Sequence, residues 1–232
     1  MPNASVPGAD GKFNAYVAKP NHSNGAGLVV IQEIFGVNKV MRDLCDHYAE
    51  QGFVAVCPDL FWRIEPNVQL TDQSEDDWAQ AFKLMEAFMP DFDKGLEDLQ
   101  TTLVYIRQMS ECENRIGCVG YCLGGSLAYS MACQSDVDAS VGYYPVQIED
   151  SLDRAQNITK PAMFHVAELD GFCPPESQEK ITRAFASNKN ITHHLYTGVD
   201  HAFARNGGTN YNAVAAALAD DRTAEFFKMH LL

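Results

Sequence analysis

The stretch "RIGCVGYCLGGSLA", from Arg115 to Ala128, decides the fold of this chain. It predicts a buried strand, a tight turn at "YCLG" and a helix that begins directly after the turn. This is the glycine pattern with which hydrolases present a serine nucleophile, but Cys122 stands at its centre. The flanking glycines allow the sharp turn, and the helix start favours the thiolate form of a cysteine. The alternative is a structural cysteine buried in a glycine-rich turn.

Short β-rich apolar runs recur along the chain, each about the length of a buried strand. Segments of helical period lie between most of them, which predicts an α/β fold: a mostly parallel sheet with helices on both faces. No linker or repeat divides the chain, so we expect residues 1–232 to form a single domain. The expected strands are Gly27–Ile31, Phe53–Val56, Ile116–Val119, Ala139–Tyr143, Ala162–Val166 and Thr192–Tyr196.

Two segments have a clear helical period. In "NKVMRDLCDHYAEQG", from Asn38 to Gly52, the predicted inner face holds Val40, Leu44, His47 and Tyr48. In "DFDKGLEDLQTTLVYIRQM", which starts at Asp91, it holds Leu96, Leu99, Leu103, Tyr105, Ile106 and Met109.

Two further segments are read from their composition. The polar segment Phe61–Asp77 is expected to be an irregular excursion near a site. The tail Tyr211–Leu232 is expected to form terminal helices that pack on the sheet.

Composition and charge narrow the partners. The net charge of −14 and the pI of about 4.7 repel nucleic acids and anionic membrane surfaces, so we expect neither as a partner. No signal peptide is recognisable and no apolar run reaches the roughly 18 residues of a membrane span, which predicts a cytoplasmic protein.

Seven cysteines without a CxxC pair argue against disulfides. No nucleotide-binding motif or cluster of metal ligands is present, so we expect no cofactor and no metal. The oligomeric state cannot be read from the sequence.

The residues that follow Cys122 carry the order expected of a nucleophile, an acid and a histidine. Asp170, in "FHVAELDGF", stands just beyond one predicted strand, and His201, in "LYTGVDHAFAR", follows the next. His201 is predicted to be the base next to the thiol, with Asp170 holding its tautomer and orientation. Asp200 adjoins His201 and so points elsewhere. His165 lies in mid-strand and is expected to be a satisfied core residue.

The motifs together resemble the dienelactone hydrolases, also called carboxymethylenebutenolidases, which are α/β-hydrolases with a cysteine nucleophile. The resemblance runs in order along nearly the whole chain. It is carried by "VIQEIFGVN" (Val30–Asn38), "GFVAVCPDL" (Gly52–Leu60), "KLMEAF" (Lys83–Phe88), "GYCLGG" (Gly120–Gly125), "VGYYP" (Val141–Pro145) and "HAFAR" (His201–Arg205).

The resemblance implies further site residues. The backbone N–H groups of Ile34 and Leu123 are the expected oxyanion hole. Glu33 is implied to lie near Cys122, either as a second base that controls thiol ionisation or as the ion-pair partner of Arg205 or another cation. Tyr143 is implied to support the site.

Departures from the family pattern concern the substrate. Arg205 matches one of two arginines that face the substrate carboxylate, but Trp78 stands where the second is expected. Phe82 replaces a tyrosine, and Ala202 replaces a serine. Arg63 is a candidate substitute cation, although a surface or packing role is the simpler interpretation.

Three functions follow from these residues. The first is a hydrolase that opens enol-lactones or activated esters through an acyl-thioester. The second is a broader cysteine esterase for neutral or bulky activated esters, with phosphotriester hydrolysis as a side reaction. The third is a non-catalytic ligand-binding member of the fold. For the first two, the partner is a small-molecule ester or lactone.

Overall fold

The computed structural model describes residues 3–113 and 115–232. The chain divides into two compact units: the first runs to Ile116 and includes Leu232, and the second is Gly117–Leu231. Whether residues 1–232 form a single domain depends on how these two units join, so the single domain stays a prediction.

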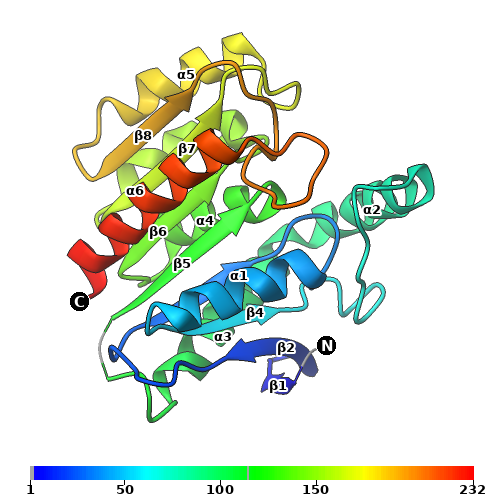
Figure 1. Cartoon of the computed structure of the whole chain (residues 1–232), viewed down its shortest axis with the longest axis vertical. Helices are drawn as coiled ribbons and strands as arrows, with labels where there is room; N and C mark the ends of the chain where they lie inside the picture. Colours follow the sequence, from blue (N-terminus) through cyan, green and yellow to red (C-terminus); the bar gives the residue numbers. More distant parts are fainter. Residues whose placement is uncertain (1–2, 114) are drawn as a thin grey trace. The chain divides into compact units, whose positions relative to one another are not determined.

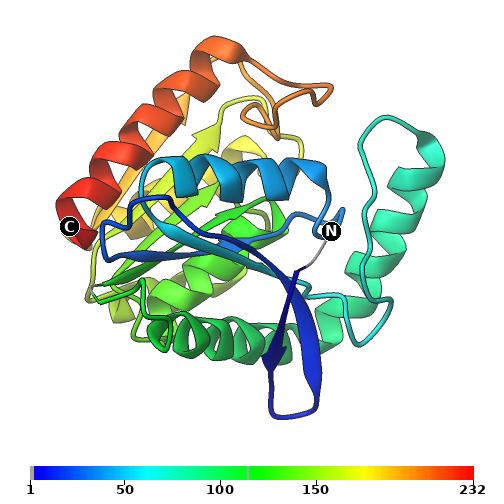
Figure 2. The same ribbon diagram turned by 60° about the horizontal axis from the view of Figure 1, so that its bottom comes forward.

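The first unit is built on a mixed sheet. Its strands are β1 (Ala4–Pro7), β2 (Lys12–Ala18), β3 (Gly27–Ile31) and β4 (Val54–Pro58), in the order β1-β2-β4-β3. β3 and β4 pair in parallel, whereas β1 and β2 are antiparallel additions. Helices α1 (Lys39–Glu50) and α3 (Phe92–Arg107) cover opposite faces of this sheet (Figure 2). β3 and β4 are therefore buried throughout, as their apolar sequences require.

The predicted face of α3 is confirmed at Leu96, Leu99, Leu103 and Ile106. The predicted face of α1 is confirmed at Tyr48 but wrong at Val40, Leu44 and His47. The buried side chains are Met41, Cys45, Tyr48 and Ala49, while Val40 and Leu44 are half-buried and His47 is exposed. The small residues Cys45 and Ala49 allow the helix to approach the strands closely, and Cys45 contacts Cys57 of β4. Packing against small side chains thus sets the helix rotation more strongly than hydrophobicity does.

The polar excursion after β4 is tied to the loop that follows β3. Gly36 forms a β-bridge with Gln69, and the Leu70 N–H donates to the Phe35 carbonyl at 3.0 Å. Gly36 has φ +74°, and a Cβ there would lie 2.2 Å from the Val68 carbonyl oxygen. The excursion then leads into α2 (Glu75–Phe88), which Ser74 caps by accepting from the Asp77 N–H, and into the short turn Met89–Asp91 before α3.

The second unit is built on parallel strands in the order β5 (Ile116–Tyr121), β6 (Ala139–Tyr143), β7 (Ala162–Ala167) and β8 (Ile191–Tyr196). Helices α4 (Leu123–Gln134) and α5 (Pro175–Phe185) lie on one face and α6 (Ala213–Leu231) on the other (Figure 1). The 3₁₀ segment Ile148–Asn157 packs against α4 and α5.

Successive residues of β7 show the two faces of this sheet. Phe164 packs against Tyr129 of α4 and Phe185 of α5, with ring centroids 5.9 and 4.9 Å away. His165 points to the opposite face and reaches Thr223 of α6. All six predicted strands are confirmed, with ends that differ by at most two residues, and the tail forms one helix, α6, rather than several.

We predict that Gly36→Ala destabilises the fold by more than the roughly 1–2 kcal/mol of a left-handed alanine, because the new Cβ also collides with the Val68 carbonyl. Gly207→Ala is the matched control: its φ is +74° as well, but nothing lies within 4 Å of the new Cβ. Urea unfolding measures both. Equal losses of stability would show that the bridge to Gln69 yields easily and does not constrain the loop.

Candidate active site

Cys122 lies at the turn between β5 and α4, with φ 56° and ψ −117°. A non-glycine residue is strained in this region, so neighbouring contacts must hold it there. Its N–H donates to the Tyr143 carbonyl at 3.1 Å, and its carbonyl accepts from the Gly125 N–H at 2.9 Å. Gly120 is required because a Cβ there would lie 1.9 Å from the Gly124 carbonyl oxygen. The thiol is thereby fixed at the N-terminus of α4, and Leu123 is the first residue of that helix.

His201 and Asp170 form a buried hydrogen-bonded pair. Asp170 follows β7 and His201 follows β8, and the Nδ1 of His201 lies 2.8 Å from the Oδ2 of Asp170. The other oxygen of Asp170 accepts from the Phe172 N–H at 2.9 Å, which fixes the carboxylate. Asp200 instead caps the backbone N–H of His201 at 2.6 Å. Asp170 therefore directs Nε2 of the imidazole away from itself, as the order of residues in the sequence predicts.

The charge of His201 depends on both neighbours. Burial lowers the pKa of His201, but the charge of Cys122 and the hydrogen bond to Asp170 outweigh this and raise the pKa to about 10. Nε2 is buried and makes no well-aligned hydrogen bond to another described side chain. The coupling to Cys122 is thus mainly electrostatic in this structure. These surroundings favour the charged, imidazolium form of His201.

Two aromatic rings that sequence reasoning missed frame the imidazole. Tyr144 and Phe172 both meet it edge to face, with ring centroids 5.0 and 4.9 Å from that of His201. Tyr144 has φ 36° and Ala202 has φ 63°, so strained backbone gathers around the pair as it does at Cys122. In the sequence, Tyr144 belongs to the motif "VGYYP" and stands between the end of β6 and Pro145. Phe172 is signalled by its place two residues after Asp170.

Tyr143 points away from the imidazole, toward α6. Its hydroxyl lies 2.7 Å from the Thr223 hydroxyl and donates to Asp220 at 2.9 Å. Thr223 also bonds Nε2 of His165 at 3.0 Å, and Nδ1 of His165 lies 2.8 Å from the Tyr196 hydroxyl. His165 is therefore a satisfied core histidine, as predicted, and its burial lowers its pKa well below the usual value. Tyr143 supports the site through its backbone carbonyl, which holds Cys122.

The remaining predicted residues lie in the first unit, apart from Arg205. Glu33 and Ile34 are buried in the loop after β3, where Gln32 holds the backbone by accepting from the Leu60 N–H at 3.1 Å. Their closeness to Cys122 stays a prediction. Arg205 is buried in the turn after His201, in the second unit.

An aromatic row extends from the Glu33–Ile34 loop of the first unit. Phe35 meets Trp78 edge to face at 5.0 Å, and Trp78 stacks on Phe82 at 5.4 Å. Phe82 remains 40% exposed, so the row presents an apolar ring to solvent.

Arg63 is not a free cation. Its guanidinium binds Asp98 at 2.5 Å and Asp10 at 3.1 Å, and it lies over the Trp62 ring. Its simpler interpretation, a packing charge, fits these contacts.

Among residues 3–113 and 115–232, no group of three or more histidine, cysteine, aspartate or glutamate side chains could hold a metal ion. None of the helices in these residues has the length and apolarity needed to cross a membrane.

Comparison with solved structures gives the class of protein. A crystal structure of a Klebsiella pneumoniae protein superposes with a TM-score of 0.85 at 24% identity, covering 98% of this chain and 97% of the other. An α/β hydrolase from Penicillium superposes with a TM-score of 0.72 at 13% identity, covering 98% of each chain. The predicted fold class is confirmed: this is an α/β-hydrolase fold.

Sequence relatives give the family. The dienelactone hydrolase family matches residues 13–231. A protein of Azospirillum brasilense is 50% identical over 234 residues, covering 100% of both chains. The carboxymethylenebutenolidase of Pseudomonas putida is 40% identical over 223 residues, covering 96% of this chain and 94% of its own. The chain belongs to the dienelactone hydrolase family and is a hydrolase, which sets aside a purely ligand-binding role.

We predict that Cys122→Ala and Asp170→Asn each lower the pKa of His201 from about 10, because each removes a negative charge that opposes the burial penalty. NMR titration of the imidazole measures this directly. In the double variant only burial remains, so its pKa falls below the ordinary 6.5.

The raised pKa of His201 also determines how the stability of the fold changes with pH. Because the folded pKa exceeds the unfolded one, protonated His201 stabilises the fold fully below about pH 6.5, and this is lost as the pH rises through about 10. A pKa of His201 that is unchanged in both single variants would contradict the coupling.

Proposed function

We propose that this hydrolase opens enol-lactones and activated esters of the dienelactone type through a Cys122, His201 and Asp170 triad. The observation that carries the proposal is the buried hydrogen bond between His201 and Asp170, 2.8 Å long, with Cys122 held at a strained helix start. The relatives named carboxymethylenebutenolidase support the substrate class.

In the first half of the proposed reaction, the Cys122 thiolate attacks the carbonyl carbon. The carbonyl oxygen becomes an oxyanion that the N–H groups of Leu123 and Ile34 would stabilise. Collapse of this intermediate breaks the carbon–oxygen bond, releases an enolate and leaves an acyl-thioester on Cys122. The imidazolium of His201 supplies the proton that the enolate takes up.

In the second half, His201 changes role. Acylation removes the negative charge of Cys122, and with it one of the causes that raise the pKa of His201. The imidazole, now neutral, can accept a proton from water, and the resulting hydroxide attacks the thioester. Collapse expels the Cys122 thiolate and releases the carboxylic acid. The Asp170 hydrogen bond keeps the ring oriented in both halves.

A thiol nucleophile restricts the substrate. A thiolate is a good leaving group, so the tetrahedral intermediate collapses forward only when the displaced group leaves at least as readily. Enolates meet this condition, whereas amines and simple alkoxides do not. Enol-lactones and activated esters are therefore favoured over amides.

The aromatic row favours a second candidate, hydrolysis of neutral or bulky activated esters. Trp78 stands where the family pattern expects an arginine, and it stacks on the exposed Phe82. Of the two arginines that the family pattern expects near the substrate carboxylate, Arg205 is then the one that this sequence retains. An apolar ring at this position would bind an uncharged substrate better than a carboxylate.

The test compares a carboxylate-bearing dienelactone with an uncharged p-nitrophenyl ester. Cys122→Ala should lower kcat/KM for both by at least about a thousandfold, since the nucleophile acts as a unit with His201. Arg205→Met keeps the side-chain volume and should raise KM for the dienelactone alone. Substantial turnover by Cys122→Ala would overturn the triad.

Trp78→Arg separates the two substrate classes. It restores the expected cation and should increase the preference for the dienelactone. Gln80→Arg on the same helix adds an equal charge away from that position and controls for the net charge of −14. A wild-type enzyme that favours the neutral ester, with Arg205→Met having no effect, would replace the first substrate class by the second.

A further inference from the structure

The hydrogen-bond ladder between β7 and β8 changes just before Asp170, where a side chain takes over from the main chain. The Glu168 N–H donates to the Tyr196 carbonyl at 3.0 Å, which is a regular parallel contact. A regular ladder would continue with the Gly198 N–H donating to the Glu168 carbonyl. Instead, the Gly198 N–H donates to the Oε2 of the Glu168 side chain at 2.7 Å. The carboxylate thus takes the place of the main-chain carbonyl, and the two chains diverge there.

This divergence precedes the two loops that carry Asp170 and His201. Beyond it, the Leu169 N–H donates to the Val199 carbonyl at 2.9 Å, a contact shifted by two residues from the register of the ladder. Asp170 follows Leu169 directly, and His201 follows soon after Val199. Their side chains meet at 2.8 Å. The shifted register therefore determines where the histidine stands relative to the aspartate.

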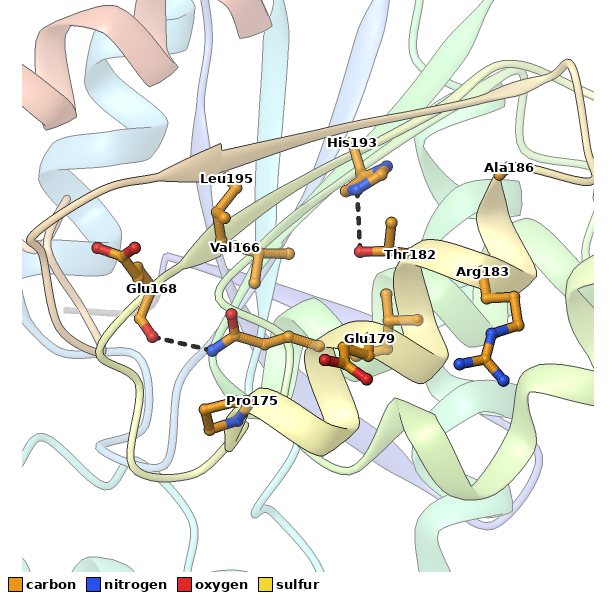
Figure 3. Close-up of a pocket in the computed structure, with 11 residues that line it drawn as sticks. Val166, Glu168, Pro175, Glu179, Thr182, Arg183, Ala186, His193 and Leu195 are labelled. Carbon is orange, nitrogen blue, oxygen red and sulfur yellow. Dashed lines mark hydrogen bonds between the residues drawn. The ribbon is translucent and has the colours of Figure 1, made fainter.

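Gln178 of α5 closes the loop that holds Asp170. Its Nε2 lies 3.2, 3.0 and 2.7 Å from the carbonyl oxygens of Ala167, Glu168 and Cys173. Figure 3 draws the bond to Glu168 as a dashed line, in a cleft of about 600 Å³ between β8 and α5. The NH₂ of the amide is the group that faces these oxygens, because the side-chain oxygen of a glutamine can only accept. One amide thus joins both ends of the loop, and it bonds the Glu168 carbonyl that the ladder no longer uses.

We propose that Glu168 and Gln178 are positioning residues for the histidine–aspartate pair. Glu168 sets the register of the loop that carries His201, and Gln178 holds the loop that carries Asp170 closed. The two contacts are linked, because Glu168 offers its carboxylate to one loop and its carbonyl to Gln178. Both residues act through the pair that they hold. The inference rests on the proposed function only in that turnover needs His201.

The surroundings of the pair make small shifts costly. Asp170 and His201 are 2% and 4% exposed, so water cannot replace a hydrogen bond that the loops fail to align. Misplacing a reacting group by about 1 Å can cost about a hundredfold in rate. The bond from the Gly198 N–H to a carboxylate is charge-assisted, which makes it one of the stronger contacts that can hold such a loop.

Gln178→Met tests the loop that carries Asp170, because it keeps the side-chain length and removes the donors. It should lower kcat/KM for the dienelactone and for the p-nitrophenyl ester by the same factor, about tenfold or more, since both substrates need the same pair. It should also lower the pKa of His201 from about 10, because the Asp170 hydrogen bond contributes to that value. Glu179→Met, the same replacement at the exposed neighbouring residue, is the control and should change neither quantity. An unchanged pKa in Gln178→Met overturns the role of Gln178.

Glu168→Met and Glu168→Gln test the other contact. Glutamine keeps an acceptor oxygen for the Gly198 N–H, whereas methionine does not. Glu168→Met should therefore lower kcat/KM and the pKa of His201 as Gln178→Met does, and Glu168→Gln should recover most of both losses. Equal losses in the two variants would assign the effect to the charge of Glu168 and overturn its positioning role. Wild-type values in Glu168→Met would overturn it as well.

NMR titration of His201 needs no substrate, so it separates this inference from the proposed function. Turnover by Cys122→Ala would overturn the triad, whereas the pKa of His201 in the methionine variants would still decide on positioning. Urea unfolding of each variant shows any loss of stability. A loss of stability with wild-type kcat/KM and a wild-type pKa would mark the contacts as merely structural and contradict the proposal. If Gln178→Met does not fold, the two Glu168 variants decide.

Discussion

The close approach of Gly120 to Gly124 is the constraint on which the site depends. Because no side chain fits between them, β5 can pass directly into α4, and Cys122 occupies the strained position between the two. The hydrogen bond from its N–H to the Tyr143 carbonyl connects this turn to the end of β6. The neighbouring Tyr144 then packs on His201. Main-chain contacts at the ends of β5 and β6 thus orient Cys122, and a ring from the turn after β6 packs on the imidazole that Asp170 holds.

The two buried histidines of the second unit differ in pKa because their neighbours differ in charge. His165 lies between two hydroxyl groups and a neighbouring histidine, so burial dominates and its pKa falls. His201 is almost as buried but stands between Asp170 and Cys122, so its pKa rises. The first remains neutral and holds α6 to the sheet. The second remains charged near neutral pH, which the proposed mechanism needs to generate a thiolate and to protonate a leaving group.

The sequence predicts the strands and the histidine–aspartate pair because both depend on local patterns. Buried parallel strands are continuous apolar runs, and Asp170 and His201 stand just beyond two of them. β1 and β2 were not predicted, because their alternating, partly polar sequences lack such a run. The rotation of α1 and the ring contacts of Tyr144 and Phe172 depend on how small side chains and turns pack. No motif or periodic pattern indicates these features, because each depends on which side chains the folded chain brings together.

The central claim is that Cys122 carries the acyl group. Rapid quenching during turnover of a slowly deacylating ester, followed by mass spectrometry of the digested protein, tests this most directly. The account predicts one acyl adduct, on the peptide that contains Cys122, which forms and decays at rates consistent with turnover. An adduct on another residue, or turnover at the normal rate with no adduct on Cys122 when deacylation limits the reaction, would contradict it.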